Sequence, residues 1–271
     1  MIDHILEFLK SLLEAYKDSL KPVVPTNAEV AKQVEIKQPM KTAGEIVKQT
    51  KGLEWCPFAV KMDKPNRMRE RGTYSGGYAK GMLVHFTSGH SGGLKKAIAS
   101  IMGGIKNGYT FLVIADSGEI VQAHHITKYG YHAGESRWDH TWLMKKLVGT
   151  VSDDLVGVEM NNAGKVKKID DNKFKTWFGT YLTKDQVRFV EEKEWGCPTG
   201  YYHKYTPEQE ATLIKFALWL KQNDPVGCFD FDYVLGHHEV SKGRKDDPGG
   251  SLSMPMSKFR ELLKQKYSEM K

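Results

Sequence analysis

Residues 236–249, with the sequence GHHEVSKGRKDDPG, hold the densest group of chemically active side chains in this chain. The stretch contains two adjacent histidines and an Asp-Pro-Gly turn, and it follows a short apolar run at residues 233–235. A strand that ends in His237 would hold that imidazole in place, and a loop punctuated by Gly and Pro could return Asp247 towards it. Imidazole nitrogens and carboxylate oxygens both bind zinc, and a catalytic zinc site needs three protein ligands. The stretch alone is therefore consistent with part of a metal site or with a solvated charged loop.

The composition is typical of a globular protein with a substantial core. The chain has 271 residues, of which 40% are hydrophobic and 11% aromatic. Its formal net charge of +7 and its pI of about 9.0 favour a polyanionic partner, such as nucleic acid, anionic lipid or an acidic cell-wall polymer. The cysteines Cys56, Cys197 and Cys228 form no CxxC pair and imply no disulfide framework, so we expect folding in a reducing cytoplasm.

An amphipathic helix is predicted at residues 2–20, because Ile5, Leu9, Leu13 and Tyr16 fall near one face. Such a helix can pack on the main domain, pair with another copy of the chain or touch a membrane. Its charge is mixed and not rich in Lys and Arg, which argues against a membrane surface. Packing on the main domain and self-association therefore remain as the two roles for this helix.

The amino-terminal region is expected to be neither a secretory signal nor a membrane span. Acidic residues such as Asp3 and Glu7 interrupt the apolar run, and no apolar run of the chain reaches the length of a span. We therefore expect a protein that acts in the cytoplasm or leaves it by another route. Residues 21–51 are polar and predict a linker. The chain is thus divided into residues 1–50, a helix with a linker, and residues 51–271, the main domain.

The main domain alternates predicted strands with predicted helices. Thr206, Pro207 and Gln209 form the sequence signature of a helix start, with a capping box and proline at the first position. The predicted elements are strands at 82–86, 110–114, 119–122, 155–160 and 233–235, and helices at 94–102, from 206 onwards and at 255–267. This alternation predicts a mixed α/β fold, a central β-sheet flanked by helices, with a helical N-terminal extension.

Three predicted strands end in residues that can bind a metal or move protons, namely His85, Glu159 and His237. In a sheet with helices between its strands, the strand ends and the loops after them build the site. A single histidine at a strand end is more often a structural residue with a satisfied hydrogen bond. The three together indicate one site at one edge of the sheet.

Six motifs of the main domain occur in a characteristic order: LVHFTSG, GYTFLVIADSGEIVQ, YHAGES, LVGVEMNNAG, YTPEQEATL and GHHEVSKGRKDDPG. In this order and approximate spacing they resemble the zinc-dependent N-acetylmuramoyl-L-alanine amidases. That family includes phage endolysins, bacterial muropeptide amidases and peptidoglycan-recognition proteins. The resemblance covers about residues 81–260. It implies an amidase-like α/β fold and cleavage of the amide bond between N-acetylmuramic acid and the L-alanine of peptidoglycan.

The resemblance also implies a set of zinc ligands. The family's first ligand falls on His85, its second on His237, which directly follows Gly236, and its third on Asp247. These residues would bind one Zn²⁺ per chain. The motif HFT stands where many members have HHT, and this difference removes no ligand.

Four further positions match the family's functional residues. Glu159 matches its glutamate, and Lys245 its lysine two residues before the last ligand. Some phage members use a tyrosine in the hairpin instead, and Tyr109 stands in that context. The histidine of the HAG motif, which usually contacts the substrate, falls on His132.

The chemistry of amide hydrolysis agrees with these roles. Zinc polarises a carbonyl and lowers the pKa of bound water towards ~7. Glu159 could accept a proton from that water and pass it to the departing amine, and Lys245 could stabilise the oxyanion. A tyrosine such as Tyr109, with an unperturbed pKa near ~10, is better suited to orienting water.

The segment 165–205 is longer than the resemblance leads us to expect. It is rich in aromatic residues, which are Trp177, Trp195, Tyr201, Tyr202 and Tyr205. These side chains could form a sugar-binding wall, or they could form a small local core. Both interpretations remain open from the sequence.

The leading hypothesis is a phage endolysin, a peptidoglycan hydrolase that accumulates in the host cytoplasm without a signal peptide and degrades the cell wall once the membrane is breached. A cytoplasmic muropeptide-recycling amidase has the same chemistry. A recognition module that binds peptidoglycan without cleaving it is disfavoured, because no predicted ligand is missing. Nucleic-acid binding is not expected, because the lysines are scattered along the chain and form no basic stripe.

Overall fold

The two longest strands of the fold, β3 (Gly81–Phe86) and β9 (Leu155–Met160), lie side by side in parallel. This arrangement is seen in a computed structural model, which describes residues 54–62, 72–74, 76–108, 112–140, 145–147 and 151–270. The predicted helix at 2–20, the predicted linker and Tyr109 lie outside the described residues.

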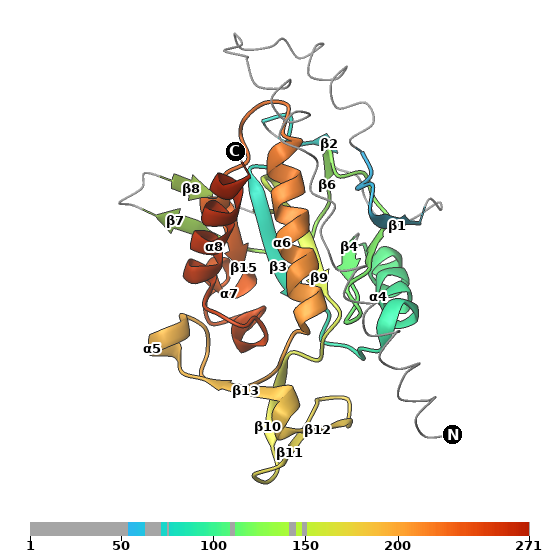
Figure 1. The fold of residues 1–271 in the computed structure, drawn as a ribbon, viewed down its shortest axis with the longest axis vertical. Coiled ribbons are helices and arrows are strands. Elements are labelled where there is room, and N and C mark those ends of the chain that lie inside the picture. Colours follow the sequence, from blue (N-terminus) through green and yellow to red (C-terminus); the bar gives the residue numbers. More distant parts are fainter. Residues whose placement is uncertain are drawn as a thin grey trace, which may run out of the picture. The chain divides into compact units, whose positions relative to one another are not determined.

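The main sheet has six strands in the order β1-β5-β4-β9-β3-β15 (Figure 1). The other four are β1 (Ala59–Lys61), β4 (Leu112–Ile114), β5 (Ile120–Gln122) and β15 (Val234–Gly236). β4, β9, β3 and β15 run parallel, whereas β4 and β5 form an antiparallel pair. The strands of a parallel sheet are buried on both faces, which explains their nearly continuous apolar sequence.

Alternate residues of β3 point to opposite faces of the sheet. Met82 and Val84 belong to the large core on the side of α6 (Pro207–Gln222) and α8 (Met256–Glu269). Leu83 belongs to a smaller core on the other side, and His85 shares its parity. Figure 1 shows α6 and α8 in front of the sheet. The candidate site therefore opens on the face away from these two helices.

The helices begin close to the predicted positions. Thr206 caps α6, where its hydroxyl oxygen accepts a hydrogen bond from the backbone N–H of Gln209 at 3.1 Å, so the predicted capping box is confirmed. α4 (Gly93–Asn107) runs longer than predicted and packs through Ala97 and Ile101 against the β4–β5 hairpin. These contacts produce the predicted arrangement, a mixed sheet flanked by helices.

The prediction that His237 ends a strand is wrong by one residue. β15 ends at Gly236, and His237 is the first residue of the short helix α7 (His237–Val240). The carboxylate of Glu239 accepts a hydrogen bond from the backbone N–H of Gly236 at 2.8 Å and is itself held by Arg260. This side-chain acceptor satisfies the N–H at the helix start, so the chain turns into a helix there.

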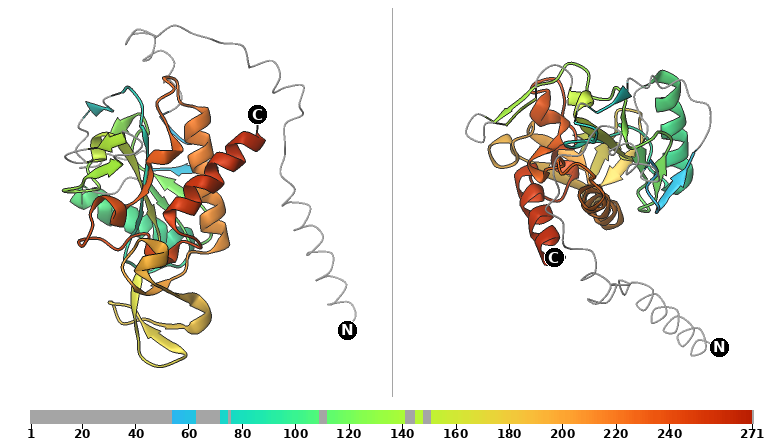
Figure 2. Two further views of the ribbon diagram at one scale, coloured as in Figure 1. Left: turned by 90° about the vertical axis from the view of Figure 1, so that its left-hand side faces the viewer. Right: turned by 90° about the horizontal axis from the view of Figure 1, so that it is seen from above.

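The segment after β9 forms a second, five-stranded sheet, here called the insert sheet. All of its neighbouring strands are antiparallel, in the order β12-β11-β10-β14-β13. The elements are β10 (Lys165–Lys168), β11 (Lys173–Lys175), β12 (Tyr181–Thr183), β13 (Val187–Val190), α5 (Glu192–Trp195) and β14 (Gly200–His203). Figures 1 and 2 show it beyond the carboxyl end of β9.

The insert sheet has a small core of its own, formed by Val166, Phe174, Leu182 and Val187. It is also joined to the main domain, because the guanidinium of Arg188 donates hydrogen bonds to the carbonyl oxygens of residues 250–252. Of the aromatic residues named in the sequence analysis, Tyr201 packs against this core, and Trp195, Tyr202 and Tyr205 pack in or against other clusters. The local-core interpretation therefore holds for these four, whereas Trp177 is 75% exposed and belongs to no core.

The remaining described elements are short. They are the ribbons β2 (Gly72–Thr73) with β6 (Lys128–Tyr129) and β7 (Trp138–His140) with β8 (Lys145–Leu147), and 3₁₀ turns at Val151–Asp153, Lys184–Gln186, Phe231–Tyr233 and Gly249–Ser251. Cys56, Cys197 and Cys228 are free thiols, as their spacing predicted.

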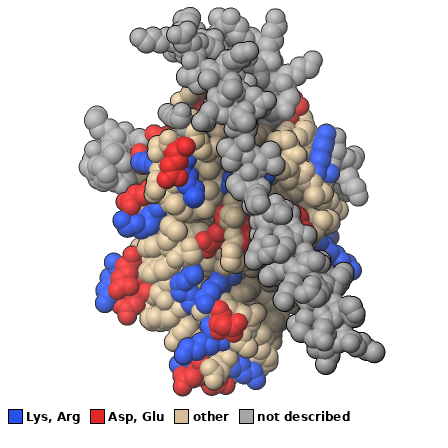
Figure 3. Space-filling view, in the orientation of Figure 1, with Lys and Arg blue, Asp and Glu red and all other residues tan. Residues whose placement is uncertain are grey.

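From the sequence we expected neither a basic stripe on the surface nor a helix that spans a membrane. On the face drawn in Figure 3, basic and acidic side chains of the described residues lie among one another. Of the helices that the structure describes, none is both long and apolar enough to cross a membrane.

Candidate active site

The candidate site lies where β3 and β9 end and α7 begins. His85 lies near the end of β3, His237 starts α7, and Asp247 lies in the loop after α7. The three residues are 3%, 2% and 5% exposed. Ionisable groups at this depth need partners, because burying an unpaired charge is costly.

The three side chains meet at one point. Nδ1 of His85 lies 2.9 Å from Nδ1 of His237 and 2.9 Å from Oδ2 of Asp247. Nδ1 of His237 lies 3.0 Å from the same carboxylate oxygen. Within the described part of the chain, these residues form a group whose ligand atoms could hold a single metal ion.

A chain of hydrogen bonds determines where the ring protons lie. Nε2 of His132 donates to the carbonyl oxygen of Leu155 at 2.9 Å, since a carbonyl oxygen can only accept. A neutral His132 therefore accepts at Nδ1, which lies 3.0 Å from Nε2 of His85. Nε2 of His237 donates to the carbonyl oxygen of Ala133 at 3.0 Å. In their neutral forms, His85 and His237 thus carry the ring proton on Nε2, and each presents a lone pair at Nδ1.

Burial favours the neutral form of His85 and of His132. Burial, and secondly the neighbouring His237, lowers the pKa of His85 from 6.5 to about 4. Burial, with His85 as the second cause, also lowers the pKa of His132 well below its ordinary value. At neutral pH the rings of His85 and His132 are therefore uncharged.

Two imidazole lone pairs and one carboxylate oxygen consequently face one another. A proton shared among them could bridge only two of the three atoms, and the lone pair of the third atom would still be repelled by the other two. A metal cation could be bound by all three, and two imidazoles with one carboxylate are a donor set that suits zinc. Ligand atoms of a tetrahedral zinc with bonds of about 2.0–2.1 Å lie roughly 3.3 Å apart, slightly more than the separations in this cluster. The residues present therefore fit the metal that the sequence predicted.

The loop that carries Asp247 is held by the residue next to His237. The backbone N–H of His238 donates to the carbonyl oxygen of Asp247 at 2.9 Å, and Nδ1 of the His238 ring lies 3.0 Å from the same oxygen. Arg244 ties this loop to the HAG motif, because its guanidinium donates to the carbonyl oxygens of Ala133 and Glu135. His238 therefore has a structural position, in which it holds the carbonyl group of Asp247.

His132 is held against β9 by two features. The hydroxyl oxygen of Ser152 accepts hydrogen bonds from the backbone N–H groups of His132 and Ala133, each at 3.1 Å. Gly157 of β9 lies beneath the ring, and a Cβ there would lie 2.6 Å from Cγ of His132. Both ring nitrogens of His132 are engaged within the protein, so neither is open to a substrate in this conformation.

Glu159 and Lys245 lie beside the cluster. Glu159 of β9 is paired in register with His85 of β3, so both side chains emerge on the same face of the sheet. Lys245 lies close enough for its charge to lower the pKa of His85. Both residues line a cavity of about 620 Å³ together with the three cluster residues.

The structure thus brings together six of the seven predicted site residues, while Tyr109 lies outside the described residues. Sequence reasoning missed Gly157 and Ser152. Gly157 had a readable signal, because a glycine inside an apolar strand marks a close approach of another group. Ser152 had none, because a serine in a loop is ordinary.

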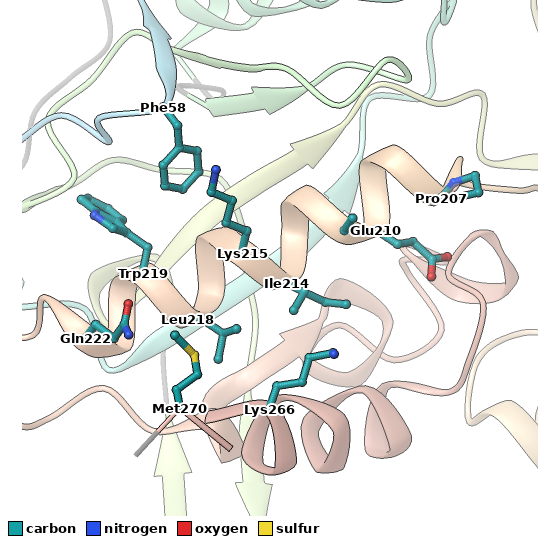
Figure 4. A pocket seen from close by; sticks show the side chains of 11 residues that line it. Phe58, Pro207, Glu210, Ile214, Lys215, Leu218, Trp219, Gln222, Lys266 and Met270 are labelled. Carbon is teal, nitrogen blue, oxygen red and sulfur yellow. The ribbon is translucent and has the colours of Figure 1, made fainter. Parts of the chain in front are cut away.

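A second hollow, of about 750 Å³, lies along α6. Figure 4 shows its apolar lining, which includes Phe58, Ile214, Leu218, Trp219 and Met270. Its lining contains one acid, Glu210, whose carboxylate accepts hydrogen bonds from Ser253. Its lining thus has no histidine and no second carboxylate, whereas the cavity at the cluster has both.

Several solved structures are similar to this chain. A selenomethionine derivative of AmpD is 19% identical with a TM-score of 0.47, over 78% of this chain and 97% of that one. AmiD from E. coli, in complex with anhydro-N-acetylmuramic acid-L-Ala-D-gamma-Glu-L-Lys, is 16% identical with a TM-score of 0.42, over 74% and 61%. The amidase LysC from Clostridium intestinale is 14% identical with a TM-score of 0.43, over 77% and 99%. Among curated proteins, none matches significantly.

The family is established by the sequence itself. Residues 75–250, well over half of the chain, match the sequence model described as N-acetylmuramoyl-L-alanine amidase. The match includes all of the predicted ligands and ends just after the loop that carries Asp247. This chain therefore belongs to the N-acetylmuramoyl-L-alanine amidase family, a family of peptidoglycan hydrolases.

Proposed function

We propose that this chain is a zinc-dependent enzyme that cleaves the amide bond between the lactyl group of N-acetylmuramic acid and the L-alanine of the stem peptide. Membership of the amidase family supports the reaction. The observation that carries the zinc dependence is the cluster of His85, His237 and Asp247, where three acceptor atoms meet with no proton to join them all.

In this proposal one zinc ion is held by Nδ1 of His85, Nδ1 of His237 and Oδ2 of Asp247. When bound, zinc supplies a Lewis acid that polarises the substrate carbonyl and lowers the pKa of water towards about 7. The ring protons of both histidines are held on Nε2, so the ligand atoms need lose no proton before they bind.

Proton transfer is assigned to Glu159. Its carboxylate accepts a proton from the attacking water and delivers it to the amide nitrogen as the C–N bond breaks, since an unprotonated amine is a poor leaving group. The ammonium of Lys245 stabilises the negative charge that develops on the carbonyl oxygen, an effect worth about 3–4 kcal/mol in comparable sites. Tyr109 is assigned a smaller part, orienting water or donating to that oxygen.

His132 is assigned a different role from the substrate contact that its motif implied. Its Nδ1 accepts a hydrogen bond from Nε2–H of His85, and its Nε2–H donates to the carbonyl oxygen of Leu155. We therefore propose that His132 is a positioning residue, which fixes the tautomer and the orientation of a metal ligand. Such partners of ligating histidines typically change metal affinity by about 10–100-fold when removed.

The biological setting proposed is that of a phage endolysin, which acts on the intact wall from the host cytoplasm after the membrane is breached. The net charge of +7 supports this setting, because a basic protein is attracted to an acidic wall polymer. In the alternative setting, a recycling amidase, the substrate is a soluble anhydro-muropeptide.

The test measures amide release by the purified, zinc-loaded protein from intact sacculi and from soluble anhydro-muropeptides. Release from sacculi that stops with a chelator and returns with zinc is expected. Activity confined to soluble muropeptides would favour recycling, and binding to sacculi without any release would favour a recognition module. Zinc-independent release would contradict the assignment of the metal.

We also propose that residues 51–271 form the catalytic domain and that residues 1–50 are an accessory segment for targeting or self-association. A chain that starts near Leu53 should fold and cleave soluble muropeptides at the full-length rate. If the segment targets or oligomerises the enzyme, this shorter chain should cleave whole walls more slowly than the full chain or have a lower mass in solution. An insoluble or inactive truncated chain would show that the first fifty residues complete the core.

A further inference from the structure

The tip of the β11–β12 hairpin in the insert sheet is a tight turn that presents two adjacent aromatic residues. The backbone N–H of Thr176 donates to the carbonyl oxygen of Thr180 at 2.9 Å, and the N–H of Thr180 donates back to the hydroxyl of Thr176 at 2.9 Å. Gly179 completes the turn with a φ of +93°, which a residue with a side chain rarely adopts. Trp177 and Phe178 therefore stand on a well-defined turn.

This tip is fastened to the loop that follows β3. The indole N–H of Trp177 donates to the carbonyl oxygen of Ser88 at 2.6 Å. The ring of Phe178 lies 4.1 Å from the ring of His90, measured between centroids. The loop at 88–90 begins just beyond the ligand His85, so the two contacts bring the tip to the active site.

Trp177 is held in place and yet left in water. Its side chain is 75% exposed, whereas Phe174 on the same hairpin is 3% exposed within the small core. Moving a large aromatic side chain out of water lowers the free energy. The hairpin buries Phe174 in this way but leaves Trp177 exposed, so the exposure of Trp177 calls for another explanation. A rigid, exposed aromatic ring of this kind is typical of a binding surface.

The ring also lines the cavity of the candidate active site. That cavity of about 620 Å³ is lined by the metal-binding cluster, by Trp177 and by the polar residues Thr87, Ser88 and Lys165 beside it. An aromatic face next to hydrogen-bonding groups matches a pyranose ring, which has an apolar face of C–H groups and a rim of hydroxyl and amide groups. The charged stem peptide matches instead the cations Arg244 and Lys245, which line the same cavity.

We propose that Trp177 is a saccharide-binding residue, whose indole face stacks against a sugar ring of the substrate's glycan strand while the cluster acts on the amide. This inference rests on the proposed function, because the sugar and the scissile amide belong to one substrate. It gives the insert sheet a role, which is to carry the sugar-binding part of the cavity.

Two substrates with the same amide bond test the proposal: a glycan strand that carries stem peptides, and a lactyl-peptide without any sugar. Trp177→Ala should lower kcat/KM on the glycan substrate about tenfold, mainly through KM, and leave kcat/KM on the lactyl-peptide unchanged. Trp177→Phe keeps an aromatic face but loses the N–H donor to Ser88, so it should retain most of the activity. Tyr181→Ala, on the same hairpin and 51% exposed, is the matched control and should have no effect.

Equal losses on both substrates would overturn the proposal, since they would mean that Trp177 only supports the fold of the site. The same conclusion would follow if Trp177→Phe were as impaired as Trp177→Ala. Calorimetry with an oligomer of N-acetylglucosamine separates this proposal from the proposed function. If the full-length protein binds the oligomer and Trp177→Ala weakens binding about tenfold, the saccharide site stands even without amidase activity. No binding by the unaltered protein, or equal binding by the variant, would refute it.

Discussion

The cluster at the end of β3 and the tip of the insert hairpin line one cavity, but they are built in different ways. The cluster is nearly inaccessible to solvent in all three of its residues, His85, His237 and Asp247. The Nε2 atoms of the two histidines point away from the cluster, and each has a hydrogen-bond partner. Trp177 is mostly exposed and is held by one hydrogen bond of its side chain. In our two proposals the main sheet carries the reacting groups and the insert sheet carries a sugar-binding residue. Substitutions in the two regions should therefore affect different measurements.

The largest effect is expected at the cluster itself. His85→Ala and Asp247→Ala should each reduce bound zinc from one per chain to almost none and abolish amide release, because two remaining ligands hold zinc poorly. Metal analysis of the purified variants is the measurement. His125→Ala, a histidine that packs on Trp55 away from the cavity, is the control and should keep its zinc. Stoichiometric zinc in both cluster variants would show that the metal site is elsewhere.

Glu159→Gln should leave zinc content and fold intact and lower turnover by about 10²-fold or more, because the amide of glutamine cannot carry the proton. Lys245→Ala should behave similarly, and Tyr109→Phe should cost less. Rates of amide release, normalised to zinc content, distinguish them. A nearly normal rate for Glu159→Gln together with an inactive Tyr109→Phe would reverse the assignment of the proton-transfer residue.

His132→Ala should weaken zinc binding by about 10–100-fold, because His85 would lose the partner that keeps its proton on Nε2. Gly157→Ala should act in the same direction, since a methyl group there would displace the His132 ring. Zinc affinity by competition with a chelator is the measurement. If His132→Ala binds zinc as tightly as the unaltered protein but has a raised KM, His132 contacts the substrate as its motif first implied.

The smallest effect is expected where the two regions are joined. Arg188→Gln removes charged hydrogen bonds to the carbonyl oxygens of residues 250–252, so stability should fall by about 1.5–3 kcal/mol. Zinc content should not change, because the ligands belong to the main domain. Denaturant unfolding and metal analysis together test this. Loss of zinc in this variant would show that the insert sheet supports the metal site, and the separation drawn between the two regions would fail.

Much of the fold was predictable because its signals are local. The capping residues of α6 and the apolar run that forms β9 depend on neighbouring positions, and both were found where predicted. The end of β15 was placed one residue late, because it depends on the pair of Glu239 with Arg260 in α8. A sequence shows both residues but does not show that a distant helix supplies the guanidinium.

The sequence alone determined the family, the α/β class and the residues that could act, since these follow from motif order, strand and helix periodicity and residue chemistry. Only the tertiary structure decided which of these residues form hydrogen bonds with one another and which are exposed to solvent. His132 turned out to hold His85 because Gly157 lets its ring lie on β9, and Trp177 turned out to face the cavity because Ser88 accepts its N–H. Hydrogen bonds and close packing join residues that are far apart in the chain, and no local pattern encodes them.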